Sequence, residues 1–165
     1  MENKTSSFAK LKTIDLDVPL HTIGFEFQDI SAEKVSGNLH LTQKCCQPYN
    51  MLHGGVSALI AEALASIGAH VACGYKRVVG VQLSINHLKP AVIGDFIHAE
   101  ATPLTVGKSI QVWDVRIWKI NPSNSQNRLL IASSRVTIKS NMPMSMSVPE
   151  NVKDAGDWLK KHAKL

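Results

Sequence analysis

Glu62 is the only formally charged side chain between Cys45 and Tyr75. Small and apolar residues surround it, especially from Val56 to Ile67. A helix without a polar face is typical of a protein core. Removing an ionised carboxylate from water costs several kcal/mol unless that carboxylate has a partner or a task. We therefore take Glu62 as the first candidate for a catalytic side chain, with an ion pair to a base on another element as the structural alternative.

Two glycines stand at the predicted start of the same helix, where Gly54 and Gly55 directly follow His53. Glycines at this position let a ligand oxygen approach the free N–H groups and the positive end of the helix dipole. A carbonyl oxygen that becomes an oxyanion would be stabilised there, and Gln47 offers an amide donor for the same oxygen. The structural alternatives are a tight loop without a ligand, a loop-bracing amide at Gln47 and a core histidine at His53.

The spacing between these groups restricts how they can act. Glu62 lies eight residues after Gly54, which corresponds to about 12 Å along a helix. One reacting carbon cannot touch both, so either they serve different purposes or the helix start of one subunit faces Glu62 of another. Ser66 follows Glu62 by four residues and shares its face. Its hydroxyl could hold a water beside the carboxylate, or bond back to the carbonyl of residue 62.

The remaining chain must supply the elements that position this helix. Apolar patterning predicts strands over residues 24–30, 35–41, 78–87, 96–101, 110–120 and 129–138, and the helix over 55–73 with Gly74 after its end. Pro19 is expected to break any helix over 18–23. The order predicts an α+β fold, a six-stranded antiparallel sheet wrapped around one long central helix that it buries on every side. Exposed sheet edges would also favour continuation of the sheet across a dimer.

The motif Gln47-Pro48 and His53-Gly54-Gly55, followed by Glu62 and Ser66, resembles the hotdog-fold acyl-CoA thioesterases. It is most similar to the 4-hydroxybenzoyl-CoA thioesterase type, which keeps its acid on the central helix. The resemblance extends in pattern over residues 24–138 and is specific over 47–66. It implies the hotdog fold, composite active sites in a homodimer, a homotetramer, the polarising N–H at residue 54, and no cofactor, since CoA is part of the substrate. Nucleophilic attack by the acid and general-base activation of water both remain open.

The resemblance also implies a substrate and its contacts. The substrate would be an aromatic acyl-CoA, with 1,4-dihydroxy-2-naphthoyl-CoA first, as in the plant peroxisomal members of phylloquinone (vitamin K1) biosynthesis. The alternatives are a broad-range acyl-CoA thioesterase, a hotdog dehydratase and a non-catalytic acyl-CoA-binding module. The expected substrate and CoA contacts are Gly80, Val81, His87 and Lys89 on one strand and its exit, and Lys108 and Ser109 in a turn. Each of these cations could instead be a solvated surface charge.

Length and composition set the remaining limits. The 165 residues, 44% of them hydrophobic and 19% charged, suit one globular domain. The net charge of +5 is scattered without a basic stripe, which argues against nucleic acid. No apolar run reaches the roughly 20 residues that span a bilayer, and no secretory segment is expected. We expect an N-terminal extension over 1–22, the hotdog domain over 23–140 and a C-terminal tail over 141–165.

The cysteines and the C-terminal triplet indicate where in the cell the protein is located. The three cysteines, Cys45, Cys46 and Cys73, lack the spacing of a metal site or a disulfide framework. They predict reduced thiols in an intracellular protein without a metal. The chain ends in Ala163-Lys164-Leu165, a near variant of the Ser-Lys-Leu address. This triplet predicts recognition by the peroxisomal import receptor and location in the peroxisome.

Overall fold

The computed structural model describes residues 12–143, 157, 159, 160 and 163. Two short helices come first, followed by two strands, a 3₁₀ turn, one long helix and four strands. In chain order these are α1 (Thr13–Leu16), α2 (Val18–Ile23), β1 (Glu26–Ile30), β2 (Val35–His40), η1 (Gln43–Cys45), α3 (Gly54–Ala72), β3 (Arg77–His87), β4 (Phe96–Val106), β5 (Ile110–Asn121) and β6 (Asn124–Met142).

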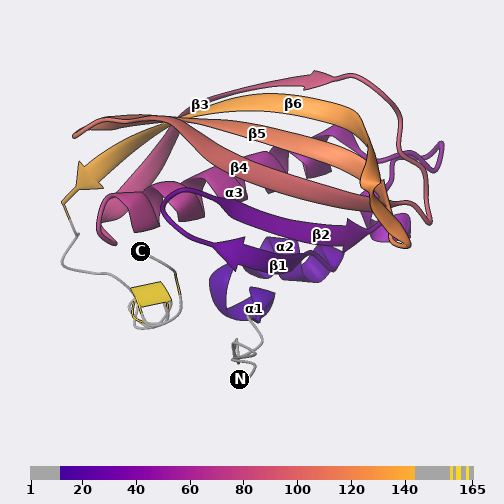
Figure 1. Ribbon diagram of the computed structural model, residues 1–165, viewed down its shortest axis with the longest axis horizontal. Helices are drawn as coiled ribbons and strands as arrows, with labels where there is room; N and C mark the ends of the chain where they lie inside the picture. Colours follow the sequence, from indigo (N-terminus) through magenta and orange to yellow (C-terminus); the bar gives the residue numbers. More distant parts are fainter. Residues whose placement is uncertain (1–11, 144–156, 158, 161–162, 164–165) are drawn as a thin grey trace, which may run out of the picture.

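The six strands form one sheet in the order β1-β2-β4-β5-β6-β3, and every neighbouring pair is antiparallel. Figure 1 shows the sheet curving over α3, which runs along its inner side. The predicted α+β fold, with one long helix and a six-stranded antiparallel sheet, is confirmed. The helix begins one residue earlier than predicted, and Gly74 follows its end in a left-handed conformation with φ of 71°.

The inner face of the sheet holds α3 by close packing and by one polar contact. Gly68 lies against the Trp113 ring, so closely that a Cβ atom at position 68 would lie 2.5 Å from the ring. The buried Gln111 side chain donates to the carbonyl of Ala69 at 3.1 Å and accepts the Trp113 indole N–H at 3.0 Å. Together these contacts fix the rotation of the helix, and therefore the direction in which each of its faces points.

One face of α3 stays open in the single chain, so the prediction that the sheet buries the helix on every side is wrong. Gly55 and Glu62 are exposed, and Leu59 and Ser66 are only partly buried. These positions form one stripe at helical spacing. By length and composition α3 would pass as a membrane-spanning helix, but its packing on the sheet identifies it as the core helix.

Strand β3 forms an edge of the sheet and lies next to this open stripe. Two of its apolar side chains are unusually accessible, with Val79 38% and Val81 59% exposed. An exposed apolar edge strand is a template for pairing with another chain. The open stripe and the open edge therefore lie side by side, since Gly80 of β3 is in contact with Glu62 of α3.

Three local predictions need correction. Pro19 lies inside the first turn of α2 and does not break it, because the missing N–H is not needed there and the Asp17 side chain accepts from the Leu20 N–H at 2.8 Å. Strand β4 runs past residue 101 to Val106, with a bulge at Pro103/Thr105. Strand β6 begins at 124 and not at 129, because a tight turn at 122–123 replaces the longer predicted loop.

We expect Gly68→Ala to lower the free energy of unfolding by about 1 to 2 kcal/mol, because the added methyl group overpacks the Trp113 ring. Glycine-to-alanine changes normally stabilise a helix by up to about 1 kcal/mol, so the sign of the change is informative. Denaturant unfolding measures it. In a Trp113→Phe background, whose ring is smaller, the loss should shrink. An unchanged or increased stability of Gly68→Ala would contradict this packing.

Candidate functional site

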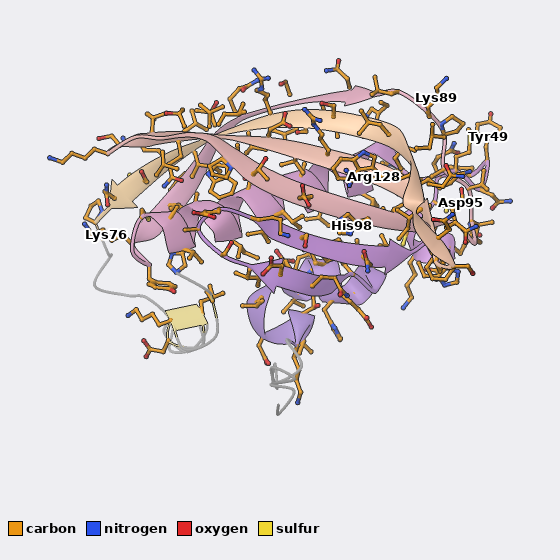
Figure 2. The ribbon with its side chains drawn as sticks, in the orientation of Figure 1. Tyr49, Lys76, Lys89, Asp95, His98 and Arg128 are labelled. Atoms are coloured by element: carbon orange, nitrogen blue, oxygen red, sulfur yellow. The ribbon has the colours of Figure 1, made fainter. Side chains whose placement is uncertain are left out.

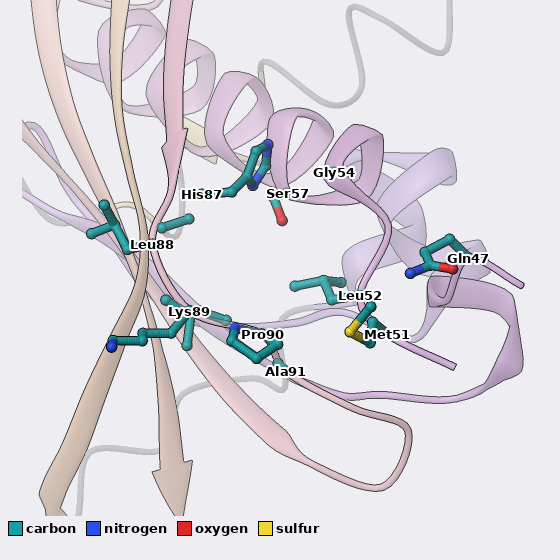
Figure 3. A pocket seen from close by; sticks show the side chains of 12 residues that line it. Gln47, Met51, Leu52, Gly54, Ser57, His87, Leu88, Lys89, Pro90 and Ala91 are labelled. Atoms are coloured by element: carbon teal, nitrogen blue, oxygen red, sulfur yellow. The ribbon is translucent and has the colours of Figure 1, made fainter. Parts of the chain in front are cut away.

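A pocket of about 420 Å³ opens at the N-terminus of α3 (Figure 3). The loop before the helix, its first turn and the segment that leaves β3 form its walls. Apolar groups make up most of the lining, and Gln47, Ser57, His87 and Lys89 are its polar members. Backbone bonds from the Leu88 and Lys89 N–H groups to the carbonyl of Ile131, at 2.8 and 3.2 Å, hold the segment after β3 in place.

The helix start offers one free backbone donor to this pocket. His53 is the N-cap of α3, and its Nδ1 accepts the Gly55 N–H at 2.9 Å. This bond leaves the Gly54 N–H, which makes no hydrogen bond within the described part of the chain, as the donor for a ligand oxygen. The His87 ring lies against Gly54, since a Cβ there would lie 3.1 Å from Nε2. Glycine at 54 therefore lets the ring and a ligand approach the same turn.

Gln47 serves both of the purposes that the sequence left open. Its Oε1 accepts the Tyr49 N–H at 2.6 Å, which braces the loop before α3. With the oxygen engaged in this way, the amide nitrogen is left to the pocket, toward which it points in Figure 3. Loop bracing and donation to a ligand are thus compatible in one side chain.

Glu62 is exposed in the single chain, against the expectation of a buried carboxylate. Its carboxylate lies over Gly80 of β3, where a Cβ atom would overlap Oε1. It forms no ion pair and no hydrogen bond with any residue that the structure describes, so the predicted alternative of an intramolecular ion pair is wrong for these residues. The Ser66 hydroxyl likewise makes no bond back to the helix within the described chain and stays available on the same face.

The predicted substrate contacts fall into three places. His87 and Lys89 line the pocket. Gly80 instead lies against Glu62, seven residues or about 23 Å back from His87 along β3, and Val81 follows it in the strand. Lys108 and Ser109 lie in the β4–β5 turn, at the end of the sheet where β3 begins. Figure 2 shows Lys89 at one end of the molecule and Lys76, just before β3, at the other. One chain does not bring all the predicted residues into one site.

Sequence reasoning missed Ser57, which the structure places in the pocket. It is 1% exposed and lies three residues after Gly54 on the same face of the helix. The available signal was this spacing, but a serine among small helical residues is unremarkable without the pocket that it faces.

Metal and thiol chemistry find no support in the residues that the structure describes. Within them, no group of three or more His, Cys, Asp or Glu side chains could hold a metal ion. Burial, followed by the neighbouring Cys45, raises the pKa of the Cys46 thiol, so this thiol stays protonated at neutral pH and is a poor nucleophile. All three cysteines carry free thiols.

Comparison with known proteins gives a consistent result. The family model described as thioesterase superfamily matches residues 49–124. A relative from Arabidopsis thaliana, named 1,4-dihydroxy-2-naphthoyl-CoA thioesterase 2, is 54% identical over 147 residues, which cover 88% of this chain and 91% of the relative. A 1,4-dihydroxy-2-naphthoyl-CoA hydrolase from Listeria monocytogenes is 36% identical over 71% of this chain and 90% of its own. The solved structure of a thioesterase from Haemophilus influenzae superposes with a TM-score of 0.71 at 27% identity, over 88% of this chain and 97% of that one.

We expect His53→Ala to lower the free energy of unfolding by about 1 kcal/mol, because the Gly55 N–H loses its cap. His53→Asn should retain most of the stability, since an asparagine oxygen can accept the same bond. Denaturant unfolding of both variants measures the difference. Equal losses in the two would show that ring packing matters and capping does not.

Proposed function

The chain belongs to the thioesterase superfamily, and we propose that it hydrolyses the thioester of 1,4-dihydroxy-2-naphthoyl-CoA to 1,4-dihydroxy-2-naphthoate and CoA, a step of phylloquinone biosynthesis. The names and the extent of identity of its plant and bacterial relatives support this substrate. The observation that carries the chemistry is the Glu62 carboxylate on the open face of α3, which has no partner among the described residues and lies eight residues after Gly54 at the helix start. No cofactor is part of the proposal, since CoA belongs to the substrate.

Two copies of the chain complete the site. If two α3 helices pair in antiparallel fashion across a twofold axis, Gly54 of one protomer faces Glu62 of the partner subunit, and two equivalent sites form. The midpoint between these positions is Ala58, a small residue that lets the two helix backbones approach closely. Pairing of the two β3 edges would extend the sheet in the same assembly. We propose this homodimer as the catalytic unit, with two of them forming a homotetramer.

The reaction then follows from the positions of the groups. The Gly54 N–H and the Gln47 amide donate to the thioester oxygen, and the helix dipole stabilises the oxyanion as its charge develops. An oxygen of the partner subunit's Glu62 attacks the carbonyl carbon, the C–S bond breaks, and CoA leaves as a thiolate that takes a proton from water. A second water hydrolyses the mixed anhydride and restores the carboxylate. In the general-base alternative, Glu62 removes a proton from a water held by Ser66, and that water attacks directly.

The CoA contacts divide between the two protomers in this arrangement. His87 and Lys89 lie at the pocket that receives the thioester, where they could contact the pantetheine or the phosphates. The antiparallel pairing places the β3-start end of the partner on the same side, so the partner subunit's Lys108 and Ser109 would supply further phosphate contacts. A lysine offers a point charge and not a bidentate fork, which favours several weak contacts over one strong contact.

A hydrolysis panel of aryl-, short-chain and long-chain acyl-CoAs tests this function. Preference for 1,4-dihydroxy-2-naphthoyl-CoA supports it, and equal turnover of all of them would indicate a broad-range thioesterase. Hydration of an enoyl-CoA would indicate a hotdog dehydratase, although His53 has no carboxylate partner among the described residues. Binding without turnover would indicate a non-catalytic acyl-CoA-binding module.

For the composite site we expect Glu62→Gln to lower kcat more than 100-fold with little change in KM, because the lost interaction belongs to the transition state. Steady-state kinetics with an aryl-CoA measures the effect. Glu100→Gln, a change of the same kind on the outer side of β4, should leave kcat within about twofold. Full turnover by Glu62→Gln would exclude the acid from the chemistry.

We also propose that the chain is carried into the peroxisome through Ala163-Lys164-Leu165, of which Lys164 and Leu165 lie outside the described residues. Deleting the triplet should leave the turnover of the purified protein intact and make a fluorescent fusion, with the tag at its N-terminus, cytosolic. Microscopy in plant cells measures this. Unaltered import of the shortened fusion would contradict the assignment of the triplet.

A further inference from the structure

Ser57 is a buried serine whose hydroxyl has no partner in the described chain. The residue is 1% exposed, and Figure 3 shows its oxygen directed away from the helix into the pocket. A helical serine usually bonds back to the carbonyl four residues earlier. Here the carbonyl of His53 instead accepts the backbone N–H groups of Val56 and Ser57, at 2.9 and 3.2 Å, and no bond from the Ser57 hydroxyl to it is formed.

The position of this hydroxyl relates it to the thioester carbonyl. Ser57 lies three residues, or about 4.5 Å of helix rise, after Gly54. Side chains on a helix tilt toward its N-terminus, so the Ser57 hydroxyl leans toward the turn that carries the free Gly54 N–H. A ligand oxygen bound at that N–H would therefore have the Ser57 hydroxyl beside it, on the inner side of the pocket.

The chemistry of the pocket limits what this hydroxyl can recognise. The surrounding walls are largely apolar, with Leu52, Ala91 and Ile131 among them, and they suit an aromatic ring. The Ser57 oxygen is not sealed off, unlike those of Ser134 and Ser140, so water in the pocket can reach it. A ligand that displaces this water leaves the hydroxyl unpaired unless it brings a polar group, and such a group is therefore expected. On an aromatic acyl group in this pocket, the ring position nearest the carbonyl that can carry a polar group is the carbon ortho to it.

We propose that Ser57 is the specificity residue that recognises a hydroxyl group ortho to the thioester carbonyl, an inference that rests on the proposed aryl-CoA hydrolysis. An ortho hydroxyl donates to the carbonyl oxygen within the substrate, at about 2.7 Å. Ser57 donates to the lone pair of the same phenolic oxygen. The substrate keeps its internal hydrogen bond, which adds to the donors at the developing oxyanion, and Ser57 fixes the ring in the orientation that presents the carbonyl to Gly54.

The test changes the protein and the substrate together. Wild type and Ser57→Ala are each assayed with 1-hydroxy-2-naphthoyl-CoA and with 2-naphthoyl-CoA, which lacks the ortho hydroxyl. We expect Ser57→Ala to lower kcat/KM about tenfold for the hydroxylated substrate and less than twofold for the other. Ser140→Ala is the control, since Ser140 is also a buried serine whose hydroxyl has no partner in the described part of the chain, and it lies eight residues further along β6 than Ala132 of the pocket. It should leave both substrates unaffected.

The possible results separate this inference from the proposed function. An equal fall for both substrates, or no fall for either, overturns the role of Ser57 while leaving aryl-CoA hydrolysis in place. No turnover of either substrate by the wild type overturns both. If Ser57→Ala does not fold, Ser57→Cys gives the same test, because a thiol of similar size is a weak hydrogen-bond donor. The wild type must also have a higher kcat/KM for 1-hydroxy-2-naphthoyl-CoA than for 2-naphthoyl-CoA. Equal values for the two substrates would contradict the inference.

Discussion

The distance between two groups on one rigid helix determines how the active site can form. The free N–H of Gly54 and the carboxylate of Glu62 are both on α3, about 12 Å apart, and no rotation of side chains brings them to one carbon atom. Gln111 and Trp113 hold the helix against the sheet and prevent it from bending to close the distance. An active site that uses both groups therefore needs a second helix.

The surface of the single chain agrees with this requirement. Gly55, Leu59, Glu62 and Ser66 form an open stripe on α3, and the adjacent edge strand β3 exposes the apolar side chains of Val79 and Val81. An open helix face next to an unpaired strand edge is unfavourable for a monomer. A twofold pairing would cover both features at once and would also remove Glu62 from bulk water, where a carboxylate is a weak nucleophile.

The sequence predicts the scaffold better than the site. The pattern of small apolar residues predicts both ends of α3 to within one residue, because such a helix packs tightly inside a curved sheet. The alternation of apolar residues predicts all six strands in their order along the chain. The expectation that Pro19 breaks a helix is wrong, because the effect of a proline depends on whether it lies in the first turn of the helix. The exposure of Glu62 could not be foreseen, because burial of a helix face depends on a partner that one sequence does not display. The position of Ser57 in the pocket, and the separation of Lys108 from Lys89, depend on how distant strands and the helix pack together. Local sequence patterns do not specify this packing or the strand register.

A subunit-mixing assay tests the shared site most directly. Gly54→Pro removes the donor N–H while keeping the helix, because proline is accepted at the first helical position and His53, with ψ of 130°, already has the extended conformation that precedes a proline. Gly54→Ala, which keeps the N–H, is its control. Gly54→Pro and Glu62→Gln subunits, each inactive alone, are co-expressed in equal amounts with different tags. A shared site predicts recovery of about one quarter of wild-type activity, since a quarter of all sites combine an intact Gly54 with an intact Glu62 of the partner subunit. Doubly tagged assemblies that show no activity would place both groups in the site of a single protomer and contradict the account.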